Sequence, residues 1–306
     1  MKKILFASLV LVCLSVLDLD ARKKAKHVVM IGVDGWAAEA VRRAPAEDLP
    51  NLHYLMEHGA WTLAKRSVMP SASAINWASM FNGLPTEQHG FSKWNSKRGT
   101  IRSITDNGHG IPPTIFTLIR EQKPDAETGI IYDWDGIGPV CDTVACSHHL
   151  YCRTCKGAEI LMPISGYTAL AVSYIKEKKP FFFTFYIGQL DETGHSCGWY
   201  GPEYMAKQKE VDAAIGQIIS ALKDAGIYDD TVMVISSDHG GLGKGHGKFT
   251  LEELETPFVV SGRKMRQGME ISAPLMQYDT PAIIADILGI KIPDEWRGRP
   301  LRQIYK

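Results

Sequence analysis

Short apolar runs that each end in polar residues recur along the chain. Four of them are "KHVVMIGVDG" at 26–35, "ETGIIYDW" at 127–134, "PFFFTFYIGQLD" at 180–191 and "TVMVISSDHG" at 231–240. They are rich in β-branched and aromatic residues, and they are too short for typical buried helices. Continuous apolar runs of this length are typical of strands that are buried on both faces, as in a parallel sheet.

Segments with apolar residues at helical spacing lie between these runs. "LPNLHYLMEHGA" at 49–60 has this spacing and a glycine near its end, and "EYMAKQKEVDAAIGQIISALKDAGI" at 203–227 is long, amphipathic and ends at Gly226. Strands that alternate with helices predict an α/β fold, a three-layer α/β/α sandwich with a mainly parallel central sheet. The sequence shows neither an internal repeat nor a low-complexity linker, so we expect a single catalytic domain over 22–306.

The N-terminus departs from this pattern. "MKKILFASLVLVCLSVLDLDA" has two lysines, an apolar run from Ile4 to Leu17 and then small and polar residues. This layout predicts a signal peptide over 1–21. Since the run is shorter than the ~20 residues of a spanning helix, we expect an exported protein, periplasmic or secreted, without a stable membrane span after cleavage.

Composition and charge narrow the range of partners. The chain has 306 residues, of which 45% are hydrophobic, and its 34 lysines and arginines equal its 34 aspartates and glutamates. A chain of this size can bury a large core. With no net charge there is no global field to attract nucleic acid or an anionic membrane, so an anionic ligand must be held locally. We expect a small-molecule partner, and no protein partner is evident.

Export changes how the cysteines are interpreted. Cys13 lies in the predicted signal peptide, which leaves Cys197 and four cysteines of "CDTVACSHHLYCRTC", namely Cys141, Cys146, Cys152 and Cys155. Their spacing would suit a zinc site, but in an oxidising compartment close cysteines more often form disulfides. We therefore expect a Cys-rich loop insertion around 141–155 with two disulfides, their pairing left open, and Cys197 as the odd thiol.

Three of the predicted strands deliver an aspartate near their ends: Asp34, Asp191 and Asp238. Each alone is better explained as a helix cap or a turn former. In open α/β sheets, however, ligands bind beyond the carboxyl ends of the strands. The three carboxylates are therefore expected to converge on one site.

Three histidines accompany the aspartates. "DETGH" places His195 four residues after Asp191, "SDHG" places His239 beside Asp238, and "GKGHG" adds His246 between glycines. A lone histidine is more often a surface or core residue, but this combination offers the oxygen and nitrogen ligands that suit zinc or a related ion. Six ligands are enough for two divalent ions, and two ions about 4 Å apart form a clamp for displacement at phosphorus.

Hydroxyls and an amide follow a proline in "VMPSASAINWASMFNGLPTEQHG" at 68–90, which has no clear helical or strand period. A metal can activate a serine hydroxyl without a histidine base, and an asparagine can donate a hydrogen bond to a phosphoryl oxygen. Ser73 fits the role of nucleophile and Asn76 the role of donor.

Together these motifs resemble the type I phosphodiesterase and nucleotide pyrophosphatase branch of the alkaline phosphatase superfamily. "IGVDG" looks like its first metal strand, and "PSASAINWASMFNGLPTEQHG" is similar, without a gap, to its nucleophile segment. "LDETGHSCG" and "SSDHGG" are similar to its Asp-x-x-Gly-His and Ser-Asp-His-Gly motifs, and "QYDTPAIIADILGIKIPDEWRGRPL" looks like the superfamily's terminal segment. The motifs run in family order over nearly the whole mature chain.

The resemblance implies an alkaline-phosphatase-like fold with two divalent ions, taken to be Zn2+. One ion would be held by Asp34, Asp238, His239 and the nucleophile Ser73. The other would be held by Asp191, His195 and a third histidine. That histidine lies far downstream in typical nucleotide pyrophosphatases, but no histidine follows His246 here. Because "DHGGLGKGHG" resembles the spacing of phosphoethanolamine-transferase relatives, the resemblance assigns His246.

The chain departs from the family pattern at two positions of the nucleophile segment. Ser73 stands where this branch usually has threonine, and Trp77 rather than histidine follows Asn76. Ser71 is the competing nucleophile, but it matches the less critical hydroxyl of the family pattern, so Ser73 is preferred.

The implied function is a secreted two-metal hydrolase of phosphoric esters, of the phosphodiesterase or nucleotide pyrophosphatase type, acting through a phospho-serine intermediate. Alternatives on the same site are a phosphomonoesterase, a phosphoethanolamine-type transferase and an inactive metal-dependent binding module. A sulfatase is disfavoured because the nucleophile segment lacks the Cys/Ser-x-Pro-x-Arg signature.

Overall fold

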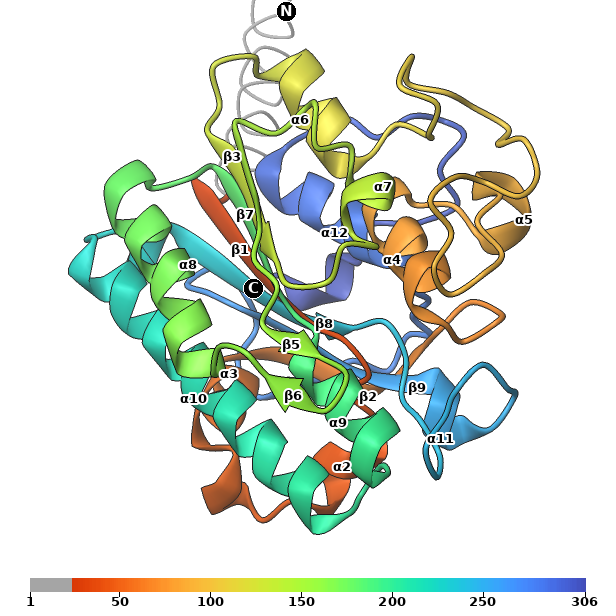
Figure 1. The fold of residues 1–306 in the computed structure, drawn as a ribbon. Helices are drawn as coiled ribbons and strands as arrows, with labels where there is room; N and C mark the ends of the chain where they lie inside the picture. The colour runs from red at the N-terminus through yellow and green to blue at the C-terminus, as the bar shows by residue number, and fades with distance from the viewer. Residues whose placement is uncertain (1–23) are drawn as a thin grey trace, which may run out of the picture.

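The central layer of the fold is an eight-stranded sheet (Figure 1). The computed structural model describes residues 24–306. Across the sheet the strands come in the order β10-β2-β9-β8-β1-β7-β3-β4, and of these strands only β9 runs against the others. The strands are β1 (His27–Val33), β2 (Gly59–Arg66), β3 (Thr128–Tyr132), β4 (His148–Tyr151), β7 (Phe182–Ile187), β8 (Thr231–Ser237), β9 (Glu255–Ser261) and β10 (Met269–Glu270). A separate ribbon pairs β5 (Cys155–Lys156) with β6 (Glu159–Ile160).

Strand β1 occupies the middle of the sheet. It pairs in parallel with β7 on one side and β8 on the other, so that Val33 lies opposite both Ile187 and Ser237. Every residue of β1 after His27 is buried, which accounts for the continuous apolar run in the sequence. The four predicted strands are β1, β3, β7 and β8, and the predicted α/β fold with a mainly parallel sheet is confirmed.

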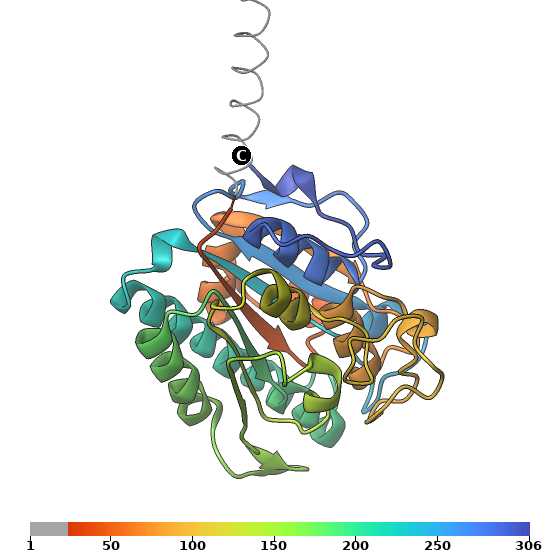
Figure 2. The same ribbon diagram turned by 90° about the horizontal axis from the view of Figure 1, so that it is seen from above.

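Helices cover both faces of the sheet and give three layers (Figure 2). Successive residues of β1 divide between two hydrophobic cores: Val28 and Met30 pack on one face, Val29 and Ile31 on the other. The first core holds residues of α4 (Ser73–Asn82), α6 (Ile115–Gln122), α7 (Gly138–Cys141) and α12 (Asp279–Leu288). The second holds residues of α2 (Ala38–Arg43), α3 (Pro50–Glu57), α8 (Ile164–Lys178), α9 (Gln189–Cys197) and α10 (Pro202–Asp224). The two predicted helices are α3 and α10.

Shorter helices lie in the connections between these elements. They are α5 (Thr86–His89), α11 (Leu251–Leu254) and the 3-10 turns η1 (Ala46–Asp48), η2 (Tyr228–Asp230) and η3 (Arg302–Ile304). No helix within residues 24–306 combines the length and the apolar character needed to cross a bilayer. The predicted signal peptide at 1–21 lies outside the described residues.

Helix α4 forms from the stretch at 68–90 that shows no regular period. All ten residues from Ser73 to Asn82 are buried, so no polar face marks the helix in the sequence. The helix ends at Gly83, which has a left-handed φ of 67° and therefore suits glycine. Because all of its residues are buried, the helix leaves no amphipathic pattern in the sequence from which it could be predicted.

The segment around 141–155 does not form the expected disulfide-stapled loop. His148–Tyr151 forms β4, which pairs in parallel with β3 at the edge of the main sheet. All five described cysteines are free. Cys141 and Cys146 pack in the core on one face of the sheet, whereas Cys152 packs against the opposite core. The strand thus separates the cysteines that the sequence places close together.

Gly32 in β1 leaves the space that the ring of Trp77 occupies. A Cβ at Gly32 would lie 2.4 Å from the ring of Trp77. We expect Gly32→Ala to lower the free energy of unfolding by about 1–3 kcal/mol, because the ring has no free space to enter. Thermal or denaturant unfolding measures this. Gly166→Ala in α8, where the nearest atom is 3.5 Å away, is the control and should leave stability unchanged or raise it. Equal effects of the two changes would contradict the prediction.

Candidate metal and nucleophile site

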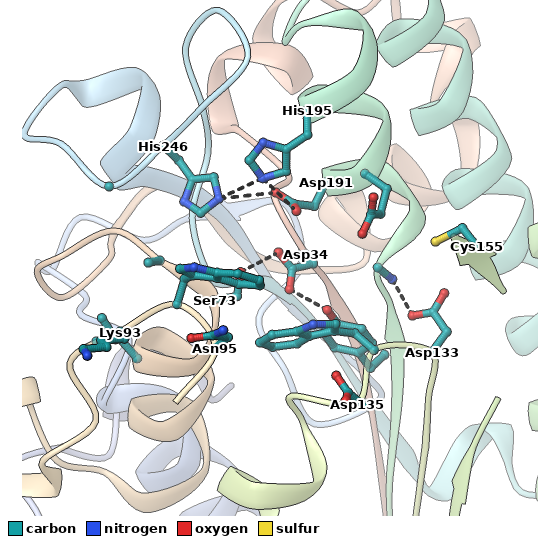
Figure 3. Close-up of a pocket in the computed structure, with 18 of the residues that line it drawn as sticks. Asp34, Ser73, Lys93, Asn95, Asp133, Asp135, Cys155, Asp191, His195 and His246 are labelled. Atoms are coloured by element: carbon teal, nitrogen blue, oxygen red, sulfur yellow. Dashed lines mark hydrogen bonds and ion pairs between the residues drawn. The ribbon is translucent and has the colours of Figure 1, made fainter. Parts of the chain in front are cut away.

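Three adjacent strands bring the predicted carboxylates together at the C-terminal edge of the sheet, and Figure 3 shows two of them, Asp34 and Asp191. Asp34 directly follows β1 and Asp238 directly follows β8. Asp191 does not end β7 but lies in the first turn of α9, which begins two residues after that strand. The expected convergence is therefore present, with one of the three carboxylates carried by a helix.

The Asp34 carboxylate is fixed by two aromatic side chains. Its Oδ2 accepts hydrogen bonds from Trp77 Nε1 at 2.9 Å and from the Tyr186 hydroxyl at 2.5 Å. Burial and the nearby charge of Asp191 raise the pKa of Asp34 well above its usual value. The Oδ1 atom is left facing the hydroxyl of Ser73 and the ring of His239. Trp77, which departs from the family pattern, thus has a defined role in holding a ligand carboxylate.

All three predicted histidines turn the same ring nitrogen into the site. Their Nδ1 atoms lie against backbone carbonyl oxygens: Lys244 O at 3.0 Å for His195, Gly240 O at 2.8 Å for His239 and Ser71 O at 2.8 Å for His246. Because a carbonyl oxygen can only accept, each Nδ1 carries the proton. In the neutral ring each Nε2 therefore presents a lone pair to the site, which is how metal-ligating histidines are usually oriented.

The donor set fits divalent cations. Asp191 Oδ1 and Asp238 Oδ2 are buried and accept no hydrogen bond, and the Nε2 atoms of His195 and His246 face each other at 3.2 Å. Two lone pairs at this distance repel unless a proton or a metal ion lies between them. A cation would also pair with these two carboxylate oxygens. A buried oxygen that accepts no hydrogen bond otherwise costs free energy.

Two groups of ligands are compact enough to hold an ion. Asp34, Asp238 and His239 form one, and Asp191, His239 and His246 form the other, with all ligand atoms of each group within 4.8 Å of one another. His239 belongs to both, and its ring stacks on that of His246 with centroids 3.7 Å apart. His195 lies beside the second group, with Nε2 3.3 Å from Asp191 Oδ2. All six predicted ligands are therefore in one place.

Ser73 is the first residue of α4 and faces this cluster. Its Oγ lies 3.1 Å from His239 Nε2 and 3.5 Å from Asp34 Oδ1. The N-terminus of a ten-residue helix favours negative charge at this position, whether on an alkoxide or on a phosphoryl group. The hydroxyl is thus placed for ligation and for attack on a bound ester.

Ser71 has a different role. Its Oγ donates to Lys248 O at 3.0 Å and accepts from Gly247 N at 3.1 Å, and its carbonyl holds His246. It is fully buried. Ser71 therefore anchors the loop that carries His246, and Ser73 is the serine that the structure places among the ligands.

Asn76 is not at the site. It is fully buried, and its Oδ1 accepts from Val68 N while its Nδ2 donates to the carbonyls of Val68, Pro70 and Ala72. With its amide occupied by backbone groups, it has no donor for a substrate oxygen. These contacts speak against the predicted role of Asn76, because they hold its amide against the backbone of residues 68–72.

Asn95 is an amide that does line the pocket. It is exposed, and Figure 3 shows it on the same side of the pocket as Ser73. Its loop is tied to the start of α4, since Ala74 N donates to Trp94 O at 3.0 Å. The sequence signal that could have identified it is the run "FSKWN", directly after the nucleophile segment.

The pocket extends well beyond the carboxylates and has a volume of about 910 Å3. Trp94 and Trp134 stand near its mouth with their rings inclined by only 19° and their centroids 6.5 Å apart.

Asp133, which follows β3, is a strand-end carboxylate that the sequence analysis missed. It accepts from Gly188 N at 2.7 Å and from the Thr154 hydroxyl at 2.6 Å, and burial raises its pKa to about 7. It therefore fixes the residue before α9 relative to the segment after β4.

A buried lysine lies behind the end of β8. Lys65 is 1% exposed and donates to Ser236 Oγ at 2.5 Å and to Ser237 O at 2.9 Å. Gln277 donates to the carbonyl of Asp238 at 2.6 Å. Burial lowers the pKa of Lys65 to about 7, although the nearby negative charge of Asp238 acts to raise it. These contacts fix the backbone that carries Asp238 and His239.

Solved structures share this architecture. Murine ectonucleotide pyrophosphatase/phosphodiesterase 5, an inactive variant in complex with AMP, aligns with a TM-score of 0.69 at 15% identity and covers 88% of this chain and 96% of that one. A 2-O GAG sulfatase aligns with a TM-score of 0.68 at 14% identity and covers 91% of this chain and 74% of that one. These likenesses show that the chain has the alkaline-phosphatase-like α/β fold.

The sequence comparisons identify the branch. The family model described as type I phosphodiesterase / nucleotide pyrophosphatase matches residues 28–256, and the chain belongs to this family. Ectonucleotide pyrophosphatase/phosphodiesterase family member 1 of Mus musculus is 24% identical over 232 residues, which are 73% of this chain and 25% of that protein. Arylsulfatase K of Xenopus laevis is 32% identical over 103 residues, which are 32% of this chain and 19% of that protein. The chain thus spans a quarter or less of the length of these curated relatives.

The two asparagines should respond differently to truncation. We expect Asn76→Ala to lower the free energy of unfolding by about 1–3 kcal/mol, because it leaves buried backbone groups unpaired. Asn95→Ala should leave the unfolding curve unchanged, since the side chain is exposed. Denaturant titration of both variants measures the difference. A stable Asn76→Ala protein would contradict the role assigned to this amide.

Divalent ions should stabilise the fold through this cluster. An ion that binds the folded chain at a hundred times its Kd adds about 2.7 kcal/mol. We therefore expect a chelator to lower the melting temperature and added zinc to restore it. His246→Ala should weaken this response, whereas His149→Ala, exposed on β4, should leave it intact. Unchanged melting with and without chelator would contradict the assignment.

Proposed function

We propose that this protein is an exported hydrolase of phosphoric diesters or pyrophosphates that uses two divalent ions, Zn2+ as the first candidate. The observation that carries the proposal is the position of Ser73 Oγ, 3.1 Å from His239 Nε2 at the start of a helix and at the floor of the pocket. Family membership supports the same reaction class. The N-terminal pattern at 1–21 supports export.

In the proposed reaction some residues hold the ions and one serine attacks phosphorus. Asp34, Asp238 and His239, with Ser73, would hold one ion, and Asp191, His195 and His246 the other; bound there, the ions lower the pKa of the serine hydroxyl and offset charge on the phosphoryl oxygens. Ser73 Oγ forms a bond to phosphorus as the bond to the leaving oxygen breaks, and its proton passes to solvent. Water then cleaves the phospho-serine ester and regenerates the hydroxyl.

Asn95 replaces Asn76 as the proposed donor to a phosphoryl oxygen. Its side chain lines the pocket on the same side as Ser73, and the first turn of α4 fixes its loop. A neutral amide at this position stabilises negative charge that grows during attack. Asn95→Ala should therefore reduce kcat in a protein whose stability is unchanged.

Pocket size and lining support a diester rather than a monoester. A volume of about 910 Å3 leaves room for organic groups on the phosphate, because small-molecule pockets typically measure about 300–1,000 Å3. Trp94 and Trp134 offer flat apolar surfaces near the mouth. Since one similar structure binds AMP, nucleotide esters are the first substrates to test.

The sulfatase alternative finds no support at the nucleophile. Ile75 and Trp77 stand where the sulfatase signature after Ser73 requires proline and arginine. The Trp77 side chain donates its Nε1 hydrogen bond to Asp34.

The two serines provide a matched test of the nucleophile. We expect Ser73→Ala to abolish turnover of a nitrophenyl nucleotide diester while two ions remain bound, as measured by metal analysis. Ser71→Ala should lower activity by loosening the His246 loop, and excess metal should restore part of it. Residual multiple turnover by Ser73→Ala would refute the nucleophile assignment.

A pair of chromogenic substrates tests the substrate class. Faster, chelator-sensitive cleavage of the nitrophenyl nucleotide diester than of nitrophenyl phosphate is the expected result. A preference for the monoester would assign the protein to the phosphatases of the superfamily. Absence of turnover with every ester, in the metal-loaded protein, would support the inactive binding module.

A further inference from the structure

Exposed apolar side chains are concentrated in three segments that contribute residues to the pocket. Among the described residues, ten large hydrophobic side chains are exposed, and nine of them lie in three segments, 94–104, 151–161 and 242–251. Phe249 is 80% exposed, Trp94 58% and Leu161 51%. The tenth, Val144, precedes β4 and therefore lies toward the opposite edge of the sheet. Single exposed apolar residues need no explanation, but their concentration in one region usually marks an interaction site.

The three segments meet at the pocket. Each contributes residues to its lining: Trp94 and Asn95 from the first, Tyr151 and Arg153 from the second, and His246 from the third. Figure 1 shows them as connections and short elements that come from separate parts of the chain. We refer to the exposed side chains of 92–104, 150–161 and 242–251 as the pocket rim.

Positive charge is interleaved with these apolar residues. The three rim segments carry eight lysines and arginines and one acidic residue, Glu159, although the whole chain has equal numbers of both. Two further acidic residues that line the pocket, Asp135 and Glu192, lie outside these segments. All eight cations are exposed, and among them only Lys97 forms a salt bridge in the described structure, with Asp135. Arg98 and Arg102 stand in the same loop as Ile104, and Lys248 is next to Phe249.

We propose that the pocket rim docks on an anionic lipid surface and brings the mouth of the pocket against the head groups. Exposed aromatic and aliphatic residues that alternate with lysine and arginine are typical of surfaces that lie at the membrane interface. Each cation near an anionic surface adds attraction, while the apolar side chains enter the boundary between head groups and acyl chains. A nucleic acid or an acidic protein would use the charges but would leave Phe249 and Leu161 in water.

The proposal goes beyond the hydrolase function and does not depend on it. Docking needs only the rim, so the test measures binding. A protein that binds vesicles without hydrolysing any ester would leave the docking proposal intact, and a hydrolase that ignores vesicles would refute docking alone.

Vesicle co-sedimentation of the purified mature protein tests the surface. We expect binding to vesicles of phosphatidylcholine mixed with phosphatidylglycerol and much weaker binding to phosphatidylcholine alone. Arg98→Glu with Arg102→Glu should weaken binding by about tenfold or more, and Phe249→Ser with Ile104→Ser by about tenfold. Thermal unfolding checks that each variant is folded.

Charge reversal at the opposite edge of the sheet is the matched control. Lys178 ends α8 and Lys291 follows α12, and both are exposed. Lys178→Glu with Lys291→Glu should leave vesicle binding unchanged. Equal loss in this control would overturn the proposal, as would binding that does not depend on phosphatidylglycerol. Tight binding to a soluble polyanion that Phe249→Ser does not affect would also overturn it and would identify an acidic polymer as the partner.

Discussion

Three buried carboxylates at the ends of neighbouring strands are the constraint on which the rest of this structure depends. Asp34, Asp191 and Asp238 are all partly or fully withdrawn from water, and like charges at such distances raise each other's cost of ionisation. Burial, and after it this repulsion, raise the pKa of Asp34 and that of Asp238 well above the usual value. Bound cations would relieve this cost, and the surrounding residues are organised to receive them.

Hydrogen bonds from neighbouring residues fix the orientation of the metal-ligand side chains. Trp77 and Tyr186 fix one carboxylate, and backbone carbonyls fix the three imidazole rings. Such outer contacts set the orientation of metal ligands and raise their affinity. Because the carbonyls belong to loops that also border the pocket, the geometry of the ligands depends on loops far apart in the sequence.

The sequence predicts those elements whose burial leaves a recognisable pattern of apolar and polar residues, and it does not predict the others. The strands with Asp34 and Asp238 could be predicted because continuous apolar runs end in a charged residue. Helix α4 could not, because all of its residues are buried. That is also why Asn76 was misassigned: without the helix, nothing in the sequence shows that its amide turns back toward the backbone. Asn95 lies in an irregular loop, where spacing carries no information about direction.

Helix α4 has one further consequence. It carries Ser73 and, one turn later, Trp77, so the group that attacks the ester and the group that steadies Asp34 are parts of one rigid rod. The spacing of Ser73 and Trp77 along the helix axis is then set by helical rise, about 6 Å over four residues. A sideways shift of this rod would displace both groups by the same amount. The surrounding loops can therefore change the shape of the pocket while the spacing of Ser73 and Trp77 stays fixed.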